Sequence, residues 1–303
     1  MEQCTIGAGL AGLGTYLYRM APGFWQQYAR EIPRPIAPPS VVPDPRRWPD
    51  RGIHAAWLGH ATVLIKCDGF TILTDPIFSA RCGISLGPVT IGIKRLVAPA
   101  LDIDQLPPID LILVSHAHMD HTDVPSLRAL ENNRTAVITS KRNSDLLRVR
   151  RYKEVRELGW NEETRVGPAV IRGLEVNHWG ARVRTDTWRG YGGYLITAGN
   201  RRILFAGDTA ATDAFRTLPS GSTHLAIMPI GTYDPWIRFH CNPEQAWRMT
   251  NDARADVVIP IHHQTFALSR EPITEPIERF HMAAGSGADR IALRSIGQEL
   301  HLS

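Results

Sequence analysis

The sequence predicts an α+β fold in which β-sheets are covered by helices. Short apolar or β-branched runs, separated by turn residues, recur in both halves of the chain, and segments with helix start signals lie between them. Of the 303 residues, 43% are hydrophobic and 21% are charged. This length and balance are typical of one large globular domain, which excludes wholesale disorder.

The first 50 residues differ in composition from the rest. We expect residues 1–50 to form an N-terminal arm and a proline-rich strap, and residues 51–303 to form the main domain. Seven prolines between Pro33 and Pro49 exclude a continuous helix there. Residues 5–18 are uncharged but too short to span a bilayer, so they predict a surface-packed arm or a membrane-touching segment. Gly7–Gly12 matches the nucleotide-loop glycine pattern, but no strand precedes it.

The main domain is expected to begin with strands. They are predicted at Ile53–Leu58, Thr62–Cys67 and Phe70–Thr74, with Asp68-Gly69 as a tight turn. The continuous apolar run Leu111–Val114 is typical of a buried strand. A helix, a strand and a second helix are then expected at Pro125–Asn133, Ala136–Thr139 and Asn143–Arg150.

The second half repeats this alternation. Four strands are predicted, at Ala169–Val176, Tyr191–Thr197, Arg202–Ala206 and Leu225–Pro229. Asn242-Pro243-Glu244 is typical of a helix N-terminus, so we expect a helix that runs to about Ala253. The remaining expected elements are a strand, a helix and a closing β segment, at Asp256–Ile261, Pro272–Ala284 and Ile291–Leu302.

A polar loop directly follows the buried strand Leu111–Val114. It contains four groups that bind metals: His116, His118, Asp120 and His121. Imidazole and carboxylate together suit zinc, manganese or iron. A strand end fixes the loop backbone and lets these side chains converge, and crowding them together without a metal would be costly.

Three further polar residues, His178, Asp208 and His262, lie where predicted strands end. Together with the loop they form two triads, one made of His116, His118 and His178 and the other of Asp120, His121 and His262. Asp208 can bridge the two metals. The sequence therefore predicts a dinuclear metal centre with seven protein ligands.

This order of residues resembles the metallo-β-lactamase superfamily. The resemblance rests on the loop His116–His121 followed by His178, Asp208 and His262, and it covers roughly Ile53 to the C-terminus. It implies a metal-dependent hydrolase built as a four-layer αββα sandwich, with the metals at one edge of the sheets. The loop motif is specific for the superfamily and not for a substrate.

Further motifs resemble, more narrowly, the N-acylphosphatidylethanolamine phospholipase D family. They are Trp57–Thr62, Leu73–Ser79, Leu106–Asp110, Pro229–Tyr233 and Thr265–Leu268. The bacterial L-ascorbate-6-phosphate lactonase branch shares some of them less fully. The chain departs from the family at His262-His263-Gln264, where members commonly have His-Trp-Gly, and this makes His262 rather than His263 the expected ligand.

Residues around the predicted centre have more than one interpretation. Asp75 either orients a ligand histidine or is a strand-end turn acid, and His60 is either a donor to a ligand or a core histidine. Asp123 is expected to cap the following helix rather than touch metal. By the narrower resemblance, His240 is the candidate contact to the substrate or leaving group, and Asp120 is assigned with it as catalytic.

These observations predict a hydrolase that holds two divalent cations, with zinc as the default and iron or manganese as alternatives. The narrower resemblance implies a phosphodiesterase acting on N-acylphosphatidylethanolamine or a related lipid. The alternative is a soluble metal-dependent lactonase or phosphate-ester hydrolase. An apolar groove leading to the metals would favour the lipid, and a small polar pocket would favour the alternative.

Composition bounds the partners and the compartment. The net charge of +4 comes without a basic-aromatic strip, so no nucleic-acid partner is expected. Four scattered cysteines predict no disulfide framework and favour a cytoplasmic, reducing compartment. Peripheral membrane contact through the arm, which includes Phe24-Trp25, and a homodimer are both compatible with the sequence.

Overall fold

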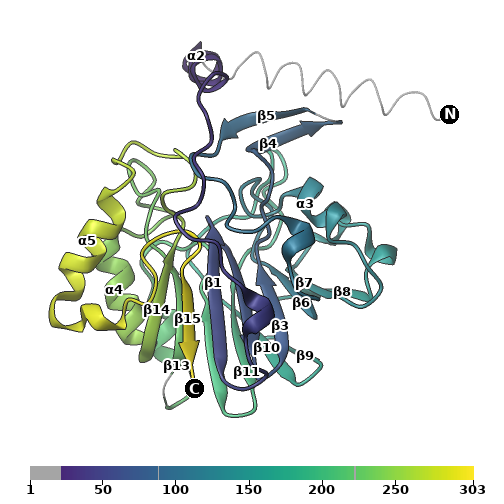
Figure 1. Cartoon of the computed structure of the whole chain (residues 1–303), viewed down its shortest axis with the longest axis vertical. Helices are drawn as coiled ribbons and strands as arrows, with labels where there is room; N and C mark the ends of the chain where they lie inside the picture. The colour runs from purple at the N-terminus through teal and green to yellow at the C-terminus, as the bar shows by residue number, and fades with distance from the viewer. Residues whose placement is uncertain (1–21, 88, 222) are drawn as a thin grey trace.

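Two β-sheets face each other in the computed structural model, which describes residues 22–87, 89–221 and 223–303 (Figure 1). The first sheet has seven strands in the order β15-β1-β2-β3-β6-β7-β8. Their bounds are β1 (Ile53–Gly59), β2 (Thr62–Cys67), β3 (Phe70–Thr74), β6 (Leu111–Val114), β7 (Ala136–Ser140), β8 (Glu154–Leu158) and β15 (Glu299–Leu302). Both faces of this sheet are covered, so β1 is buried along its whole length.

The second sheet has six strands in the order β14-β13-β12-β11-β10-β9. Their bounds are β9 (Glu163–Val166), β10 (Ala169–Leu174), β11 (Gly193–Ala198), β12 (Arg201–Phe205), β13 (Thr223–Pro229) and β14 (Ala255–Ile261). Strands β9 to β12 pair antiparallel, whereas β12, β13 and β14 run parallel. The main apolar core lies between the two sheets.

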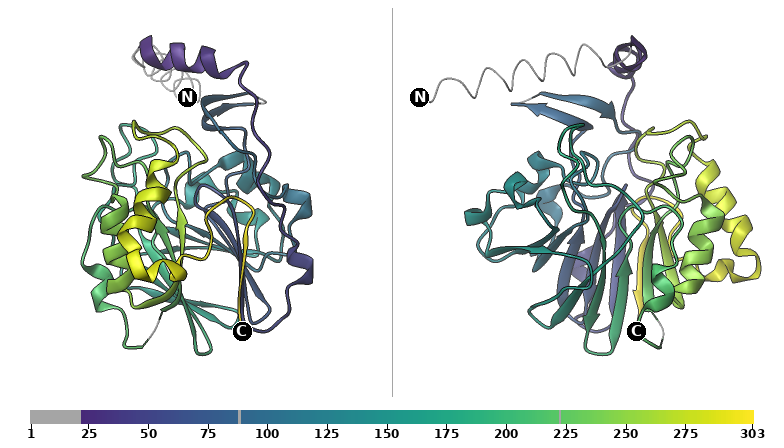
Figure 2. Two further views of the ribbon diagram at one scale, coloured as in Figure 1. Left: turned by 60° about the vertical axis from the view of Figure 1, so that its left-hand side comes forward. Right: turned by 180° about the vertical axis from the view of Figure 1, so that it is seen from behind.

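Helices cover the outer faces and complete four layers. On one side α3 (Val124–Ala129) contributes Leu127 to the main core. On the other side α4 (Pro243–Asp252) and α5 (Glu275–Ala284) bury Met249 and Phe280 in a second core against β12, β13 and β14. The views in Figures 1 and 2 show this layering. The expected αββα sandwich is therefore confirmed.

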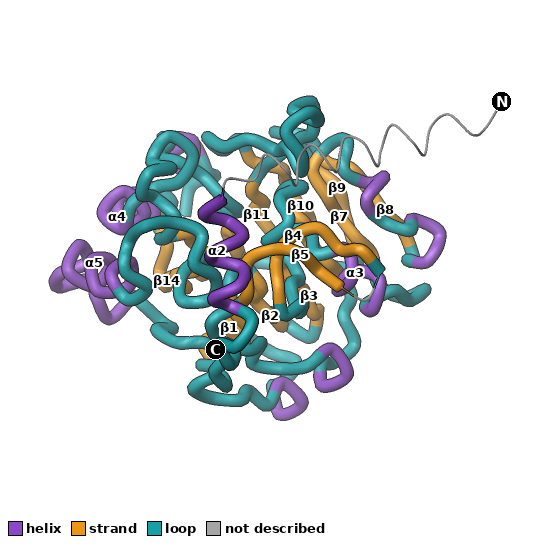
Figure 3. The backbone as a smooth tube through the Cα atoms, turned by 90° about the horizontal axis from the view of Figure 1, so that it is seen from above, coloured by secondary structure: helices purple, strands orange, loops and turns teal. Residues whose placement is uncertain are grey.

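A hairpin and a helix project from one end of the sandwich. The hairpin consists of β4 (Arg81–Leu86) and β5 (Val89–Lys94), and α2 (Pro22–Glu31) packs against β5. Glu31 joins them, because its carboxylate accepts from Arg81 Nη1 at 2.9 Å and from the backbone N of Lys94 at 2.8 Å. Figure 3 shows α2, β4 and β5 overlying this end when it is seen from above.

The strap between α2 and β1 runs along the body. Ala37 forms a bridge with Val97, and the Trp48 indole N–H donates to Glu299 Oε1 at 2.6 Å. Trp48 is itself part of the main core. Residues 1–21, which include Gly7–Gly12 and most of the predicted arm, lie outside the described residues. No helix of the described ranges is long and apolar enough to cross a bilayer.

Two expected elements are wrong in part. Asn143–Arg150 is not an α-helix but contains short 3₁₀ turns, because the Glu157 carboxylate accepts the backbone N–H groups of Arg142, Asn143 and Ser144 and holds this segment in a turn. The closing strand begins only at Glu299, after a turn in which Gln298 accepts from the backbone N of Arg294. Elements that the sequence pattern did not reveal are α2, β4, β5, β8 and β9.

Candidate metal centre

The predicted ligand loop leaves β6 and curls tightly. Its first residue is tied down, because buried Asp75 accepts from the backbone N of Ser115 at 2.7 Å. The backbone N of Thr122 then donates to His118 O at 2.8 Å, and Thr122 Oγ1 donates to His116 O at 2.6 Å. These bonds turn the loop back on itself, so the side chains between them converge.

Three histidines meet on one side of the loop. His116 Nε2 lies 2.8 Å from His118 Nδ1, and His178 Nε2 lies 3.3 Å from the same atom. His178 comes from the loop after β10, so this group joins the two sheets. We call His116, His118 and His178 the histidine cluster. It is the first of the two predicted triads.

A second group contains a carboxylate. Asp120 Oδ2 lies 3.5 Å from His121 Nε2 and 3.4 Å from His262 Nε2, and the two imidazole nitrogens are 3.2 Å apart. His262 follows β14 with a positive φ of 64°, which turns its side chain back toward the loop. We call Asp120, His121 and His262 the carboxylate cluster. It is the second predicted triad.

Asp208 lies between the two clusters. Its Oδ2 is 3.1 Å from both His121 Nε2 and His262 Nε2 in the carboxylate cluster. The same atom is 3.9 Å from His116 Nε2 and 3.8 Å from His178 Nε2 in the histidine cluster. One carboxylate oxygen of Asp208 thus lies within 4 Å of nitrogens from both clusters. The structure thus brings together all seven residues that the sequence predicted as ligands.

The donor atoms fit divalent cations better than they fit one another. Imidazole nitrogens of different histidines lie 2.8 to 3.3 Å apart, and each such pair needs a proton or a cation between its members. Asp208 Oδ1 and His118 Nε2 are buried and have no hydrogen-bond partner. Because buried polar atoms are rarely left unsatisfied, these atoms indicate a site whose ligation is completed by metal.

Electrostatics separate the two clusters. Burial lowers the pKa of His118 to about 3 and also lowers the pKa values of His116 and His178. Burial opposes charge on His262 too, but Asp208 and Asp120 outweigh it and raise the His262 pKa to about 9. The same carboxylates, together with Asp75, outweigh burial and raise the pKa of His121. The histidine cluster is therefore neutral, whereas the carboxylate cluster holds protons against its acids.

The outward nitrogens of four ligand histidines are held by neighbouring groups. Asp75 Oδ2 lies 2.6 Å from His121 Nδ1, which settles its two interpretations in favour of an orienting residue. The other three contacts were not predicted: Ser115 Oγ at 2.9 Å from His116 Nδ1, Phe239 O at 2.8 Å from His178 Nδ1, and Thr232 Oγ1 at 3.1 Å from His262 Nδ1. Ser115 and Thr232 were visible as polar residues beside ligand motifs, but a backbone carbonyl leaves no sequence signal.

Two further polar residues, His60 and Asp123, lie behind the loop. His60 is buried, and its Nε2 lies 2.9 Å from Asp120 Oδ2, so it supports a predicted ligand. Asp123 stands at the N-cap position of α3, as expected, but its side chain makes no capping bond to the helix backbone. Its carboxylate instead accepts from the Ser126 hydroxyl and from the backbone N of Ser79. The expected position is correct and the expected bond is wrong.

His240 lies against the centre from the loop before α4. Its Nδ1 is 3.7 Å from Asp208 Oδ2 and has no hydrogen-bond partner, and its ring centroid is 5.0 Å from that of His178. Burial lowers its pKa to about 3, so the imidazole is neutral. His263, by contrast, stacks on Trp57 at 4.6 Å, in accord with the choice of His262 as the ligand. Cys241, which follows His240, is buried.

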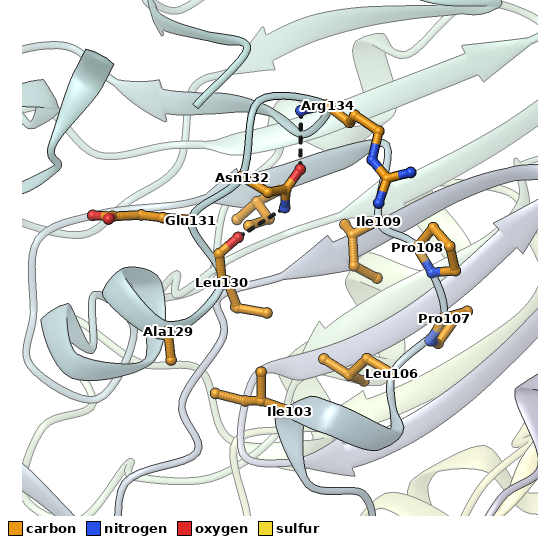
Figure 4. Close-up of a pocket in the computed structure, with 11 residues that line it drawn as sticks. Ile103, Leu106, Pro107, Pro108, Ile109, Ala129, Leu130, Glu131, Asn132 and Arg134 are labelled. Carbon is orange, nitrogen blue, oxygen red and sulfur yellow. Dashed lines mark hydrogen bonds between the residues drawn. The ribbon is translucent and has the colours of Figure 1, made fainter. Parts of the chain in front are cut away.

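Access to the centre is from one side. His118, Met119 and Asp120 are partly exposed, whereas His116 and His121 are buried. Beside Met119 lies a pocket of about 490 Å³ between the β4–β5 hairpin and α3. A separate pocket of about 300 Å³, shown in Figure 4, is lined by residues such as Leu106, Pro108 and Arg134 and by none of the predicted ligands. The pocket beside Met119 adjoins the ligand loop, although none of the seven predicted ligands lines it, and the pocket that His262 lines has a volume of only about 10 Å³.

Comparison with known proteins places the chain in a family. Residues 71–263 match the model of the Beta-lactamase superfamily domain. The chain belongs to the metallo-β-lactamase superfamily. As a member of this superfamily it is a metal-dependent hydrolase, and its candidate metal-binding clusters are formed by histidine and aspartate side chains.

The relatives of this superfamily member include both uncharacterised proteins and lipid hydrolases. An uncharacterised protein of Mycobacterium tuberculosis is 31% identical, over 91% of this chain and 76% of the relative. An N-acyl-phosphatidylethanolamine-hydrolyzing phospholipase D of Caenorhabditis elegans is 30% identical, over 76% of this chain and 69% of the relative. The solved isothiocyanate hydrolase from Delia radicum gut bacteria has a TM-score of 0.64 at 18% identity, over 82% of this chain and 99% of that one, and shows the fold alone.

Proposed function

We propose that this chain is a phospholipase D-type phosphodiesterase that hydrolyses N-acylphosphatidylethanolamine or a related phospholipid. The observation that carries the proposal is the joint presence of seven converging ligand side chains and 30% identity to a phospholipase D of that specificity over most of the chain. Two divalent cations, zinc by default for this set of histidine and aspartate donors, complete the site. The residues of the histidine cluster would hold one of them and those of the carboxylate cluster the other, with Asp208 between the clusters.

The proposed reaction is hydrolysis of one phosphoester bond. The bound cations would supply an acidified water and neutralise charge on the phosphate. The oxygen of water forms a bond to phosphorus, the bond from phosphorus to the ethanolamine oxygen breaks, and that oxygen takes up a proton. The products are a phosphatidate and an N-acylethanolamine, and no oxidant or reductant is needed.

The chain's own residues position this reaction. Asp75, Ser115, Phe239 and Thr232 fix the orientation of the ligand imidazoles through their outward nitrogens. His240 stands beside Asp208 with Nδ1 unpartnered, where its neutral imidazole is available to hydrogen-bond the substrate or leaving group. The pocket beside Met119 combines apolar side chains such as Ile84 and Val124 with Arg128 and Arg182, as suits an amphiphilic anion.

The test is a substrate panel on protein reconstituted with zinc, manganese or iron. The panel contains N-acylphosphatidylethanolamine, phosphatidylethanolamine, a phosphomonoester and several lactones, and products are identified by mass spectrometry. We expect N-acylethanolamine and phosphatidate, with oxygen from ¹⁸O-labelled water in the phosphatidate. Hydrolysis of lactones alone, or release of a free fatty acid, would show that the lipid phosphodiesterase assignment is wrong.

A further inference from the structure

Large apolar side chains are exposed around the candidate metal centre. Trp236 is 49% exposed, Trp179 is 43% exposed and Val89, on the hairpin, is 53% exposed. We call this set the apolar collar, and its members are Leu86, Val89, Trp179, Val183, Trp236, Ile237 and Phe239. Exposed apolar residues scattered singly are ordinary, but a group gathered at one functional end indicates an interaction surface.

The collar residues belong to neighbouring loops. Trp179 directly follows His178, its ring centroid is 5.8 Å from that of Phe239, and it lies 4.8 Å from the His118 ring. The turn that carries Trp236 and Ile237 closes on itself, since Phe239 N donates to Trp236 O at 2.8 Å. These loops therefore meet next to the histidine cluster.

The hairpin extends the collar on its other side. Ile84 and Gly87 of the hairpin line the same 490 Å³ pocket as Val183 and Met119. The collar thus follows the open side of the centre from the turn at Trp236 to the hairpin. Figures 1 and 2 show that the hairpin projects from the end of the sandwich opposite the C-terminus.

Positive charge accompanies the collar. Arg128, Arg182, Arg184 and Arg238 lie within or beside it, and none of them forms an ion pair with another described residue. Arg182 donates to two neutral carbonyls, Ala117 O at 3.0 Å and Thr122 O at 2.8 Å, while the carboxylates of Asp123, Asp186 and Asp120 act on its charge without forming an ion pair with it.

The carboxylates that act on Arg182 are also bound to other residues, Asp120 to His60 and Asp123 to the backbone N of Ser79. Asp186 is occupied by Arg189 at 2.6 Å. Asp234, the acidic residue in the turn before Trp236, is exposed. A surface of tryptophan and aliphatic side chains ringed by unpaired arginine suits an anionic lipid interface, where indole rings lie at headgroup depth and cations meet acidic headgroups. A second copy of the chain would bring the same arginines face to face.

We infer that the apolar collar docks on an anionic lipid bilayer, with the candidate metal centre facing the membrane. The biological reason for this docking rests on the proposed function, since a lipid hydrolase has to reach a substrate that resides in a bilayer. In this orientation a lipid reaches the centre through the pocket between the hairpin and Arg182. The surface lies within the main domain and does not depend on residues 1–21.

Flotation with vesicles that contain no substrate tests the surface. The full chain, loaded with zinc, is mixed with phosphatidylcholine vesicles or with mixed phosphatidylcholine–phosphatidylglycerol vesicles. We expect binding to the mixed vesicles, with a strong dependence on salt. The double variants Trp236→Ser/Ile237→Ser and Arg184→Gln/Arg238→Gln should each bind about tenfold more weakly, because bound apolar area and cationic charge both set the affinity.

Matched controls separate the surface from general effects. Met282→Ser removes an apolar side chain that is 72% exposed on α5, and Arg46→Gln/Arg51→Gln removes the same charge from the strap region, so both should bind like the wild type. Equal binding by collar and control variants would overturn the inference, as would a collar variant that dissociates a dimer in the absence of vesicles. Turnover of the water-soluble bis(p-nitrophenyl) phosphate should be the same in all variants. Wild-type protein that binds vesicles but cleaves no phospholipid would refute the proposed function and leave the docking surface standing.

Discussion

The histidine cluster and the carboxylate cluster lie side by side around Asp208, yet they are built differently. His116, His118 and His178 are neutral imidazoles, and their outward contacts are a serine hydroxyl and a backbone carbonyl. The carboxylate cluster contains Asp120 and is supported by a second buried acid, Asp75. Neutral hydrogen-bond partners thus hold the histidine cluster in place, whereas charged carboxylates hold the carboxylate cluster in place.

This difference has a consequence for metal binding. The pKa of His118 is lowered to about 3, so no proton has to leave the histidine cluster at neutral pH before a metal binds. The pKa of His262 is raised to about 9, so a cation entering the carboxylate cluster has to displace protons. The two halves of one centre should therefore respond differently to substitution and to pH.

Substitution of the shared residue should have the largest effect. Asp208→Ala removes the carboxylate that approaches both clusters, and we expect loss of metal from both together with a fall in turnover of about a thousandfold or more. Metal content by mass spectrometry, read alongside turnover, tests this. Activity lost with both metals retained would argue against a bridging position for Asp208.

A substitution within one cluster should remove the metal of that cluster and leave the metal of the other. His118→Gln should remove one metal and Asp120→Asn the other, and each should lower turnover by about a hundredfold, because one cation alone stabilises less charge on the phosphate. Native mass spectrometry would count one metal per chain in each variant. If either variant lost both metals, the two clusters would not be separable.

His240 should affect turnover without affecting metal. His240→Ala is expected to lower phosphodiester turnover by about a hundredfold while both cations remain, because each triad is complete without it, although His240 Nδ1 lies 3.7 Å from Asp208 Oδ2 and His178, Asp208 and His240 form a further group that could hold a metal. Steady-state kinetics combined with metal analysis distinguishes the cases. Unchanged turnover in the metal-loaded variant would remove the assigned role.

The residues behind the ligands should act mainly on one cluster each. Asp75→Asn is expected to weaken metal binding at the carboxylate cluster by about tenfold to a hundredfold and to affect the histidine cluster less, because Asp75 contacts His121 directly and reaches His116 only through Ser115. Ser115→Ala is the matched substitution behind His116 and should have the smaller effect, because it removes a neutral partner. Competition with a metal-chelating dye measures both affinities, and equal losses at both clusters would contradict the contrast drawn between them.

A pH titration should show the smallest but most selective difference. Because the His262 pKa is raised, this group is protonated below about pH 9, and affinity at the carboxylate cluster should fall by about tenfold per pH unit for each displaced proton as the pH is lowered. The His118 pKa of about 3 predicts no such loss at the histidine cluster near neutrality. Zinc affinity is measured as a function of pH in His118→Gln, which retains the carboxylate cluster, and in Asp120→Asn, which retains the histidine cluster. The same pH dependence in both variants would refute the predicted difference.

The sequence predicted most of the fold where local patterns carry the information. The buried strand Leu111–Val114 and the capped helix after Asn242 were found because apolar continuity and capping residues act within a few positions. The hairpin β4–β5 was missed because its strands mix apolar with polar residues and pack on α2, far away in sequence. The helix expected at Asn143–Arg150 failed for the same kind of reason, since Glu157 from the next strand captures its backbone N–H groups.

What the sequence by itself determined is the chemistry of the centre. The spacing within His116–His121 and the residues at three later strand ends specify which side chains form the candidate metal-binding clusters, because each strand end delivers its polar residue to the same end of a sheet. Only the tertiary structure decided what surrounds them. The carbonyl of Phe239 behind His178, the contact of Asp75 with His121, and the gathering of Trp179, Phe239 and the hairpin into one surface all depend on packing between distant segments, and no local pattern encodes such contacts.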